Sequence, residues 1–200
     1  MQHKLAITQV DIHNLIASRW SPRAFDPDKA VSHQDLTAVL EAARWAPSCF
    51  NDQPWRFVVC DKSSNVAAWQ NMLSVIAEKN QLWAKNAPVL ILTVAMENFN
   101  HNGKANRWAA YDTGAASLSL CLQANALGLI THQMGGFDAD KARQALNLPN
   151  DCTPMAMLAM GYQAEADTLA EDFQAAEQAE RSRAALEQRF YLGQWGEAFK

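Results

Sequence analysis

APSCFNDQPWRF, residues 46–57, marks a change from helical to extended structure. Residues 33–46 before it have helical spacing of apolar residues, and Ser32 is of the type that caps a helix N-terminus. Residues 55–61 (WRFVVCD) are rich in β-branched and aromatic residues, which predicts a strand with Trp55 as its core anchor. Pro47 and Pro54 bound the polar centre. Taken alone, the stretch fits a plain turn as well as a ligand-binding one.

The pattern outward from this stretch predicts a mixed chain with few strands. A capping box at Thr8 and Asp11 predicts a first helix, which Pro22 ends. Further helices are expected over 65–80, 104–127 and 138–147, the last with Asp138 as N-cap, and strands over 87–95, 127–134 and 153–162. Helices mixed with few strands indicate α+β or α/β with one central sheet.

Composition narrows the class of protein. At 200 residues the chain predicts one domain, and 49% hydrophobic residues suffice for a core. The formal charge of −4 gives no long-range attraction to nucleic acid or membrane surfaces, so neither is expected as a partner. The four cysteines form no C-x-x-C pair and the histidines lack ligand spacing, so no metal site is expected. With no signal-peptide pattern, we expect a cytoplasmic location.

Three short motifs could bind a ligand. SRWSPRAF, residues 18–25, places Arg19 and Arg23 around Ser21 at a helix end, which fits a phosphate site or a solvated helix end. The second is the polar stretch already quoted. QMGGF, residues 133–137, allows close backbone approach at Gly135 and Gly136, although a plain glycine turn fits too. Because no familiar catalytic set is present, a cofactor is expected to carry the chemistry.

In order and spacing, these motifs resemble those of the nitroreductase family of FMN-dependent oxidoreductases. The resemblance is carried by Arg19-Trp20-Ser21-Pro22-Arg23 and by Ala46-Pro47-Ser48-Cys49-Phe50-Asn51-Asp52-Gln53-Pro54-Trp55. A buried helix within 104–127, the turn at 133–137 and the late pair Arg181 and Arg183 follow in the same order. The resemblance covers nearly the whole chain, and the Q-P-W segment is its most specific part.

This resemblance implies an α+β fold with a central, mostly antiparallel sheet flanked by helices. It implies a homodimer of single-domain subunits (1–200), whose residues 163–200 wrap the partner, with FMN at the interface. Arg19, Ser21, Arg181 and Arg183 would bind the phosphate, and Arg23 would lie near N1 and O2 of the ring. The partner's Pro47, Ser48 and Asn51 would contact FMN, and Gly135 and Gly136 would present N–H groups near N5. The full expected set is Arg19, Trp20, Ser21, Arg23, Pro47, Ser48, Cys49, Asn51, Gln133, Met134, Gly135, Gly136, Arg181 and Arg183.

The resemblance also implies the activity. NADH or NADPH would give a hydride to N5 of FMN, and a nitroaromatic, quinone or similar small electron-poor acceptor would take it in a ping-pong reaction. No protein side chain is expected to be catalytic. Asn71 is a candidate for a polar residue at the ring edge. Three alternatives stay open at this point: a non-catalytic FMN-binding or regulatory dimer, a specialised flavin reductase or oxidase, and an interaction protein with chance motif matches.

Overall fold

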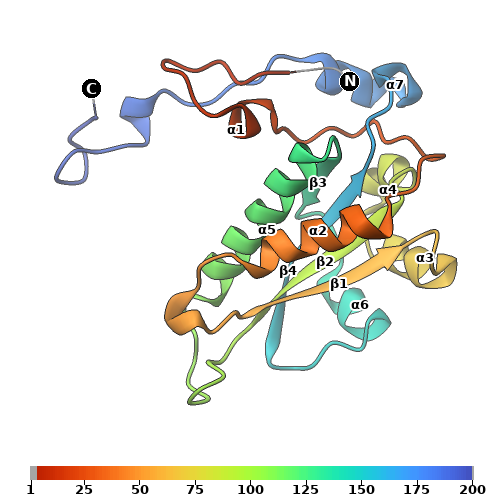
Figure 1. Cartoon of the computed structure of the whole chain (residues 1–200), viewed down its shortest axis with the longest axis horizontal. Helices are drawn as coiled ribbons and strands as arrows, with labels where there is room; N and C mark the ends of the chain where they lie inside the picture. Colours follow the sequence, from red (N-terminus) through yellow and green to blue (C-terminus); the bar gives the residue numbers. More distant parts are fainter. Residues whose placement is uncertain (1–3, 200) are drawn as a thin grey trace.

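Four antiparallel strands form the sheet at the centre of this computed structural model, which describes residues 4–199 (Figure 1). The strand order is β1-β2-β4-β3, and every neighbouring pair is antiparallel. The strands are β1 (Trp55–Asp61), β2 (Val89–Met96), β3 (Ile130–Met134) and β4 (Cys152–Gly161). The antiparallel pairing decides for α+β between the two classes that the element pattern left open, and it confirms the expected mostly antiparallel sheet.

Both faces of the sheet are buried, because its central strands β2 and β4 are apolar at most positions. Leu90 and Leu92 of β2 face one core, together with helices α3 (Val66–Ser74), α4 (Glu78–Ala84) and α6 (Ala139–Ala145). Val89 and Ile91 face the other core, under α2 (His33–Arg44) and α5 (Ala109–Ala126). This alternation follows from the two-residue period of a strand. Figure 1 shows α2 and α5 lying across the same face of the sheet. The result is a three-layer arrangement of helices, sheet and helices.

Several helix boundaries follow the local signals in the sequence. Helix α2 (His33–Arg44) begins after Ser32, whose Oγ accepts a hydrogen bond from the Asp35 N–H at 3.0 Å. Helix α6 (Ala139–Ala145) begins after Asp138, whose carboxylate accepts from the Lys141 N–H at 3.0 Å. These two N-caps are as expected, because the capping bond lies within three residues and needs no tertiary contact.

Three expected helices have different boundaries. Helix α1 spans only Asn14–Ser18 and is capped by His13, not by Thr8. The helix expected over 65–80 is divided into α3 (Val66–Ser74) and α4 (Glu78–Ala84). Helix α5 covers Ala109–Ala126, and the residues before it form a turn closed by a bridge between Asn98 and Ala105. In each case a backbone contact distant in sequence, such as Ala6 N–H to Ala17 O at 2.9 Å, replaces local helical bonds.

After β4 the chain returns to the N-terminal segment. Helix α7 (Glu171–Gln178) buries Phe173 and Glu177, and two short 3₁₀ turns, Ala166–Thr168 and Leu186–Gln188, lie on either side of it. Both ends of the described chain lie at the same end of the molecule (Figure 1). No helix among residues 4–199 has both the length and the apolar character that crossing a membrane requires.

Candidate functional site

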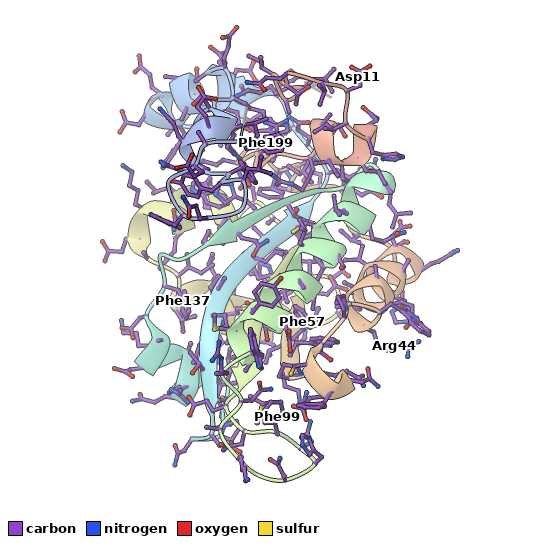
Figure 2. All side chains as sticks on the ribbon, turned by 90° about the vertical axis from the view of Figure 1, so that its left-hand side faces the viewer. Asp11, Arg44, Phe57, Phe99, Phe137 and Phe199 are labelled. Carbon is purple, nitrogen blue, oxygen red and sulfur yellow. The ribbon has the colours of Figure 1, made fainter. Side chains whose placement is uncertain are left out.

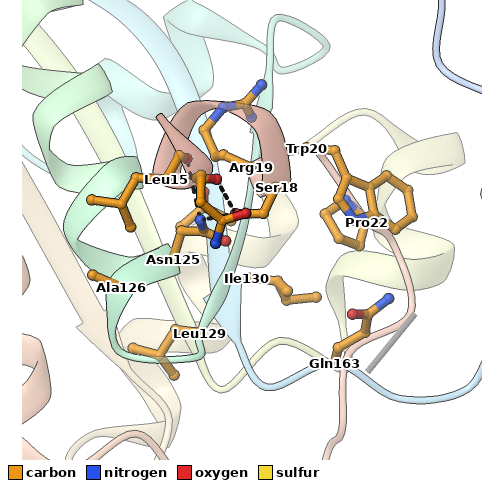
Figure 3. A pocket seen from close by; sticks show the side chains of 12 residues that line it. Leu15, Ser18, Arg19, Trp20, Pro22, Asn125, Ala126, Leu129, Ile130 and Gln163 are labelled. Carbon is orange, nitrogen blue, oxygen red and sulfur yellow. Dashed lines mark hydrogen bonds between the residues drawn. The ribbon is translucent and has the colours of Figure 1, made fainter. Parts of the chain in front are cut away.

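The Arg19–Arg23 segment is anchored to the C-terminal end of α5. The side-chain amide of Asn125 donates to Ser18 Oγ at 2.8 Å and to the Leu15 carbonyl at 3.2 Å. Figure 3 shows these bonds beside a cavity of about 220 Å³ that Trp20 also borders. Since Ser18 and Leu15 belong to α1, Asn125 fixes the end of that helix and therefore the direction in which Arg19 leaves it.

A second cavity brings together residues from the two ends of the chain. The Arg181 guanidinium donates to the carbonyl oxygens of Lys4 and Ala17, at 2.7 and 2.6 Å, and so ties the tail to the N-terminal segment. The cavity has a volume of about 220 Å³. Its lining residues are Lys4, Arg19, Trp20, Ser21, Arg23, Ala176, Ala179, Glu180, Arg181 and Arg183. We call it the basic cavity; it holds six of the expected site residues.

Positive charge dominates the basic cavity. Among the described residues, no guanidinium nitrogen of its four arginines lies within 4.0 Å of a carboxylate oxygen, although Glu180 also lines the cavity. Burial lowers the pKa of Arg181, and repulsion from Arg19 and Arg183 lowers it further. Guanidinium groups without carboxylate partners are suited to bind phosphate oxygens through paired N–H donors. The arrangement therefore favours an anionic ligand.

The glycine turn follows β3 at a distance from the basic cavity. The Gly136 carbonyl accepts hydrogen bonds from Ala77 N–H at 3.0 Å and from Asn80 Nδ2 at 3.3 Å, at the break between α3 and α4. The N–H groups of Gly135 and Gly136 donate to no acceptor found within residues 4–199. A Cβ at Gly135 would stand in open space. The turn can therefore present backbone donors to a ligand.

Three expected residues near this turn have other surroundings. Gln133 Nε2 donates to Cys121 Sγ at 3.4 Å, and the Met134 side chain is buried in the core. Asn71 Nδ2 donates to the Ala145 carbonyl at 2.8 Å and so ties α3 to α6. Within the described chain, the side chains of Gln133 and Met134 therefore stabilise the region before the turn. The asparagine that contacts the glycine turn is Asn80, whereas Asn71 contacts α6.

His132 links the basic cavity to the sheet. Its ring packs 4.6 Å from the Trp83 ring, centre to centre, and its Nδ1 lies 3.0 Å from the Pro22 carbonyl oxygen. Because a carbonyl oxygen only accepts, Nδ1 must carry the proton that forms this bond. Burial lowers the pKa of His132 to about 4, and repulsion from Arg23 contributes to the shift. The imidazole is therefore neutral near pH 7.

This low pKa predicts acid sensitivity. An unfolded histidine titrates near pH 6.5, so between pH 6.5 and 4 the unfolded chain takes up a proton that folded His132 refuses. The free energy of unfolding should therefore fall by about 3 kcal/mol from this group as the pH drops through that window. A His132→Asn variant keeps a donor but does not titrate, so urea unfolding at pH 7.5, 5.5 and 4.5 should give it the flatter profile. Exposed His33→Asn is the control, and parallel profiles for wild type and His132→Asn would contradict the assignment.

The polar stretch 47–53 has a strained backbone held by specific contacts. Phe50, Asn51 and Gln53 have positive φ angles of 55°, 56° and 52°. Such angles are unfavourable for residues other than glycine and recur at ligand sites. Gln53 N–H donates to Ser48 Oγ at 3.0 Å, and Cys49 N–H donates to Asp112 in the first turn of α5 at 3.0 Å. These two bonds hold the strained backbone in place, so that the polar groups of the stretch have fixed positions.

The expected residues of this stretch do not reach the basic cavity of the same chain. Cys49 is bound at Asp112 and the Arg19 segment at Asn125, which are 13 residues apart on α5, or roughly 20 Å at 1.5 Å per residue. Figure 2 shows Phe99, whose ring packs against Phe50, and Phe199 of the tail at opposite ends of the molecule. Pro47, Ser48, Cys49 and Asn51 therefore form a separate group from the cavity arginines.

Four residues of the site escaped the sequence analysis. Lys4 lines the basic cavity, Trp83 and Glu177 contact the segment that carries Arg23, and Asp112 holds Cys49. Sequence reasoning missed Glu177 because an acidic residue in a polar tail is expected to face solvent. Its one local signal is the four-residue spacing from Phe173, which places both on the buried side of α7.

Comparison with known proteins shows the family to which the chain belongs. The family model described as "Nitroreductase family" matches residues 16–162. A solved structure described as an oxidoreductase containing FMN is 32% identical, with a TM-score of 0.90 over 98% of this chain and 99% of its own. A nitroreductase family protein from Clostridium difficile 630 is 26% identical, with a TM-score of 0.70 over 92% and 99%. The "Major NAD(P)H-flavin oxidoreductase" of Aliivibrio fischeri is 39% identical over 75 residues, which are 38% of this chain and 33% of that protein. The chain therefore belongs to the nitroreductase family.

Proposed function

We propose that this protein is an FMN-dependent oxidoreductase that uses NADH or NADPH to reduce nitroaromatic, quinone or related electron-poor acceptors. The observation that carries the proposal is the meeting of Arg19, Ser21 and Arg23 with Arg181 and Arg183 in one basic cavity. Two segments about 160 residues apart, both rich in arginine, converge there without carboxylate ion pairs among the described residues. A dianionic phosphate is the ligand that this donor set suits best.

The residues present fit FMN. Arg19, Ser21, Arg181 and Arg183 would bind its phosphate, and Arg23 would stand nearer the ring. His132 precedes Gly135 by three residues, so the free N–H groups of the glycine turn lie about 10 Å further along the strand direction. This spacing between the Pro22–Arg23 end of the basic cavity, which His132 contacts, and the free donors suits a long, flat ligand. FMN, when bound, supplies the hydride chemistry that the side chains lack.

A variant of Arg23 tests whether this residue lies near the flavin ring. Its guanidinium would favour the negative charge that the flavin gains on reduction. Arg23→Ala should therefore make the reduction potential of bound FMN more negative, with a smaller effect on FMN affinity than loss of Arg19. Spectroelectrochemical titration of the loaded variant measures the potential. An unchanged potential together with a large loss of affinity would instead place Arg23 at the phosphate.

We further propose that the active form is a homodimer, with FMN between the subunits. Pro47, Ser48, Cys49 and Asn51 would then contact FMN from the partner subunit, because they are too distant from the basic cavity of their own chain. Tyr111 and Leu118 of α5 expose apolar side chains, as do Leu192 and Trp195 of the tail. A second subunit would cover them, with residues 163–200 wrapping around it.

The proposed acceptor site lies beside the strained stretch. Phe50, Asn51, Asp52, Gln53, Asn100 and His101 line an open cavity of about 500 Å³. The rings of Phe50, Phe99 and His101 pack against one another at 5.2–5.9 Å between centres. Aromatic walls suit flat acceptor molecules.

We also propose that the protein acts in the cytoplasm, where NAD(P)H is available.

The test begins with the purified protein. Denaturation should release FMN, identified by mass and fluorescence, at about one equivalent per chain after loading. Stopped-flow mixing with NADH or NADPH without oxygen should then bleach the flavin, and a quinone or nitroaromatic should restore its colour. Failure to bind FMN would overturn the proposal, whereas bound FMN that never bleaches would indicate a non-catalytic FMN-binding dimer.

A further inference from the structure

A fully buried carboxylate lies directly beneath the basic cavity. Glu177, on α7, has a relative exposure of 0%. Its Oε1 accepts hydrogen bonds from the backbone N–H groups of Arg23 at 2.9 Å and Ala24 at 3.2 Å, and its Oε2 lies 3.0 Å from the Arg23 nitrogen. Burying an ionised carboxylate is costly unless strong donors compensate. The two backbone donors that follow Pro22 serve this role.

The same turn is held from its other side by His132. Its Nδ1–H donates to the Pro22 carbonyl at 3.0 Å, as described above. Pro22, Arg23 and Ala24, which we call the Arg23 turn, are thus held by one side chain from the sheet and one from the C-terminal tail. The Ala24 carbonyl also accepts from the Ala164 N–H at 2.9 Å. The Pro22 carbonyl and the N–H groups of Arg23 and Ala24 are each satisfied by an ionisable side chain and not by regular secondary structure.

The Arg23 side chain extends from this turn over an aromatic wall. Its guanidinium carbon is 6.0 Å from the centre of the Trp83 ring, which packs against the His132 ring at 4.6 Å. Trp83 is itself buried and stacks on Phe25, which lies two residues beyond Arg23, at 6.2 Å. The position of the guanidinium is therefore set by the backbone of the turn and by this wall.

We propose that Glu177 and His132 are positioning residues that together hold the Arg23 turn, so that the tail helix sets where the Arg23 guanidinium stands. For the flavin, this inference rests on the function proposed above. It adds that the C-terminal extension does more than supply Arg181 and Arg183: through Glu177 it also controls the ring end of the site.

Neutralising Glu177 separates this role from a simple charge effect. If Glu177 acted only through space, Glu177→Gln would remove a negative charge, tighten FMN binding and raise the potential of the bound flavin. If it holds the turn, the same variant replaces Oε2 by an NH2 group that cannot accept from the Arg23 N–H. The two backbone donors are then left with one neutral, weaker acceptor, and Arg23 can move. FMN affinity should then fall by about tenfold or more, as for loss of a hydrogen bond to a charged group, and the potential should become more negative. The two explanations predict opposite signs.

The matched control is Glu171→Gln. Glu171 lies on the same helix α7, is exposed and is not among the residues that line the basic cavity, and no hydrogen bond from the Arg23 turn to it is found among the described residues. This control should leave the FMN affinity and the potential unchanged. A second pair tests the other side of the turn: His132→Ala should behave like Glu177→Gln, whereas His132→Asn, whose Nδ2 replaces the imidazole Nδ1 as donor, should restore most of the affinity and potential.

A further measurement needs no flavin. In the FMN-free protein, hydrogen exchange of the Arg23 and Ala24 amides should accelerate at least tenfold in Glu177→Gln and remain unchanged in Glu171→Gln. Slow exchange in Glu177→Gln, or a potential at saturating FMN equal to that of the wild type, would overturn the inference. If the wild type bound no FMN, the proposed function would fail, while the exchange data would still decide whether Glu177 holds the turn. Should Glu177→Gln not fold, the His132→Ala and His132→Asn pair decides the same question.

Discussion

An Arg19→Ala variant is expected to bind FMN roughly 10- to 150-fold more weakly than the wild type. The variant loses the guanidinium of Arg19, which follows the end of α1 and lines the basic cavity. This group is not paired with a carboxylate within residues 4–199. Hydrogen bonds to charged groups contribute about 1.5–3 kcal/mol, and about 1.4 kcal/mol corresponds to a tenfold change in Kd. The effect should decrease as salt rises, because the interaction is between charges.

Titration of the FMN-free protein, followed by flavin fluorescence, measures this Kd. Arg44→Ala is the control, because Arg44 on α2 already forms an ion pair with Glu41 and is exposed. Its Kd should equal that of the wild type. If Arg19→Ala lowered only the melting temperature at saturating FMN and left Kd unchanged, Arg19 would have no part in binding the phosphate.

A Leu118→Arg variant should dissociate into monomers and lose most of its FMN affinity. Leu118 is 50% exposed on α5, while Leu120, two residues further, is completely buried in the core under that helix. In the proposed dimer, the new charge would be buried opposite its own copy without a partner. Such burial costs about 3–5 kcal/mol, which raises the dimer Kd by more than 100-fold.

Sedimentation velocity at micromolar concentration tests this expectation, and circular dichroism checks that the monomer stays folded. Val66→Arg on α3 is a matched control, since Val66 is also 50% exposed but lies on the opposite layer of helices. Val66→Arg should remain dimeric and bind FMN. A Leu118→Arg protein that is still a dimer with bound FMN would show that this face of α5 is not the interface.

Local signals accounted for much of the fold. The strand over 55–61 was predicted with its exact limits, because β-branched and aromatic residues lie between a proline and a polar turn. Ser32 and Asp138 marked helix starts, since each caps a donor only three residues ahead. The motifs around Arg19, Asn51 and Gly135 identified the family that the comparisons show.

Local sequence signals did not predict the contacts between segments that are distant in sequence. One helix was expected over 65–80, yet the helix breaks at residues 75–77. There Ala77 N–H bonds to Gly136 and Val75 O accepts from Asp138, both more than 58 residues away. The sequence contains no local signal for this exchange, because a helical bond and a bond to a distant loop satisfy the same backbone group equally well.

The sequence by itself determined the family, the antiparallel α+β class that the resemblance implied, and the residues available to bind a phosphate. Only the tertiary structure decided that Lys4 lines the basic cavity, that Cys49 stands at the other end of α5, and that Glu177 is buried. The physical reason is that propensity, capping and turn formation act over a few residues. The charge and strain of a site depend instead on which distant segments are packed together, and only the folded chain fixes that.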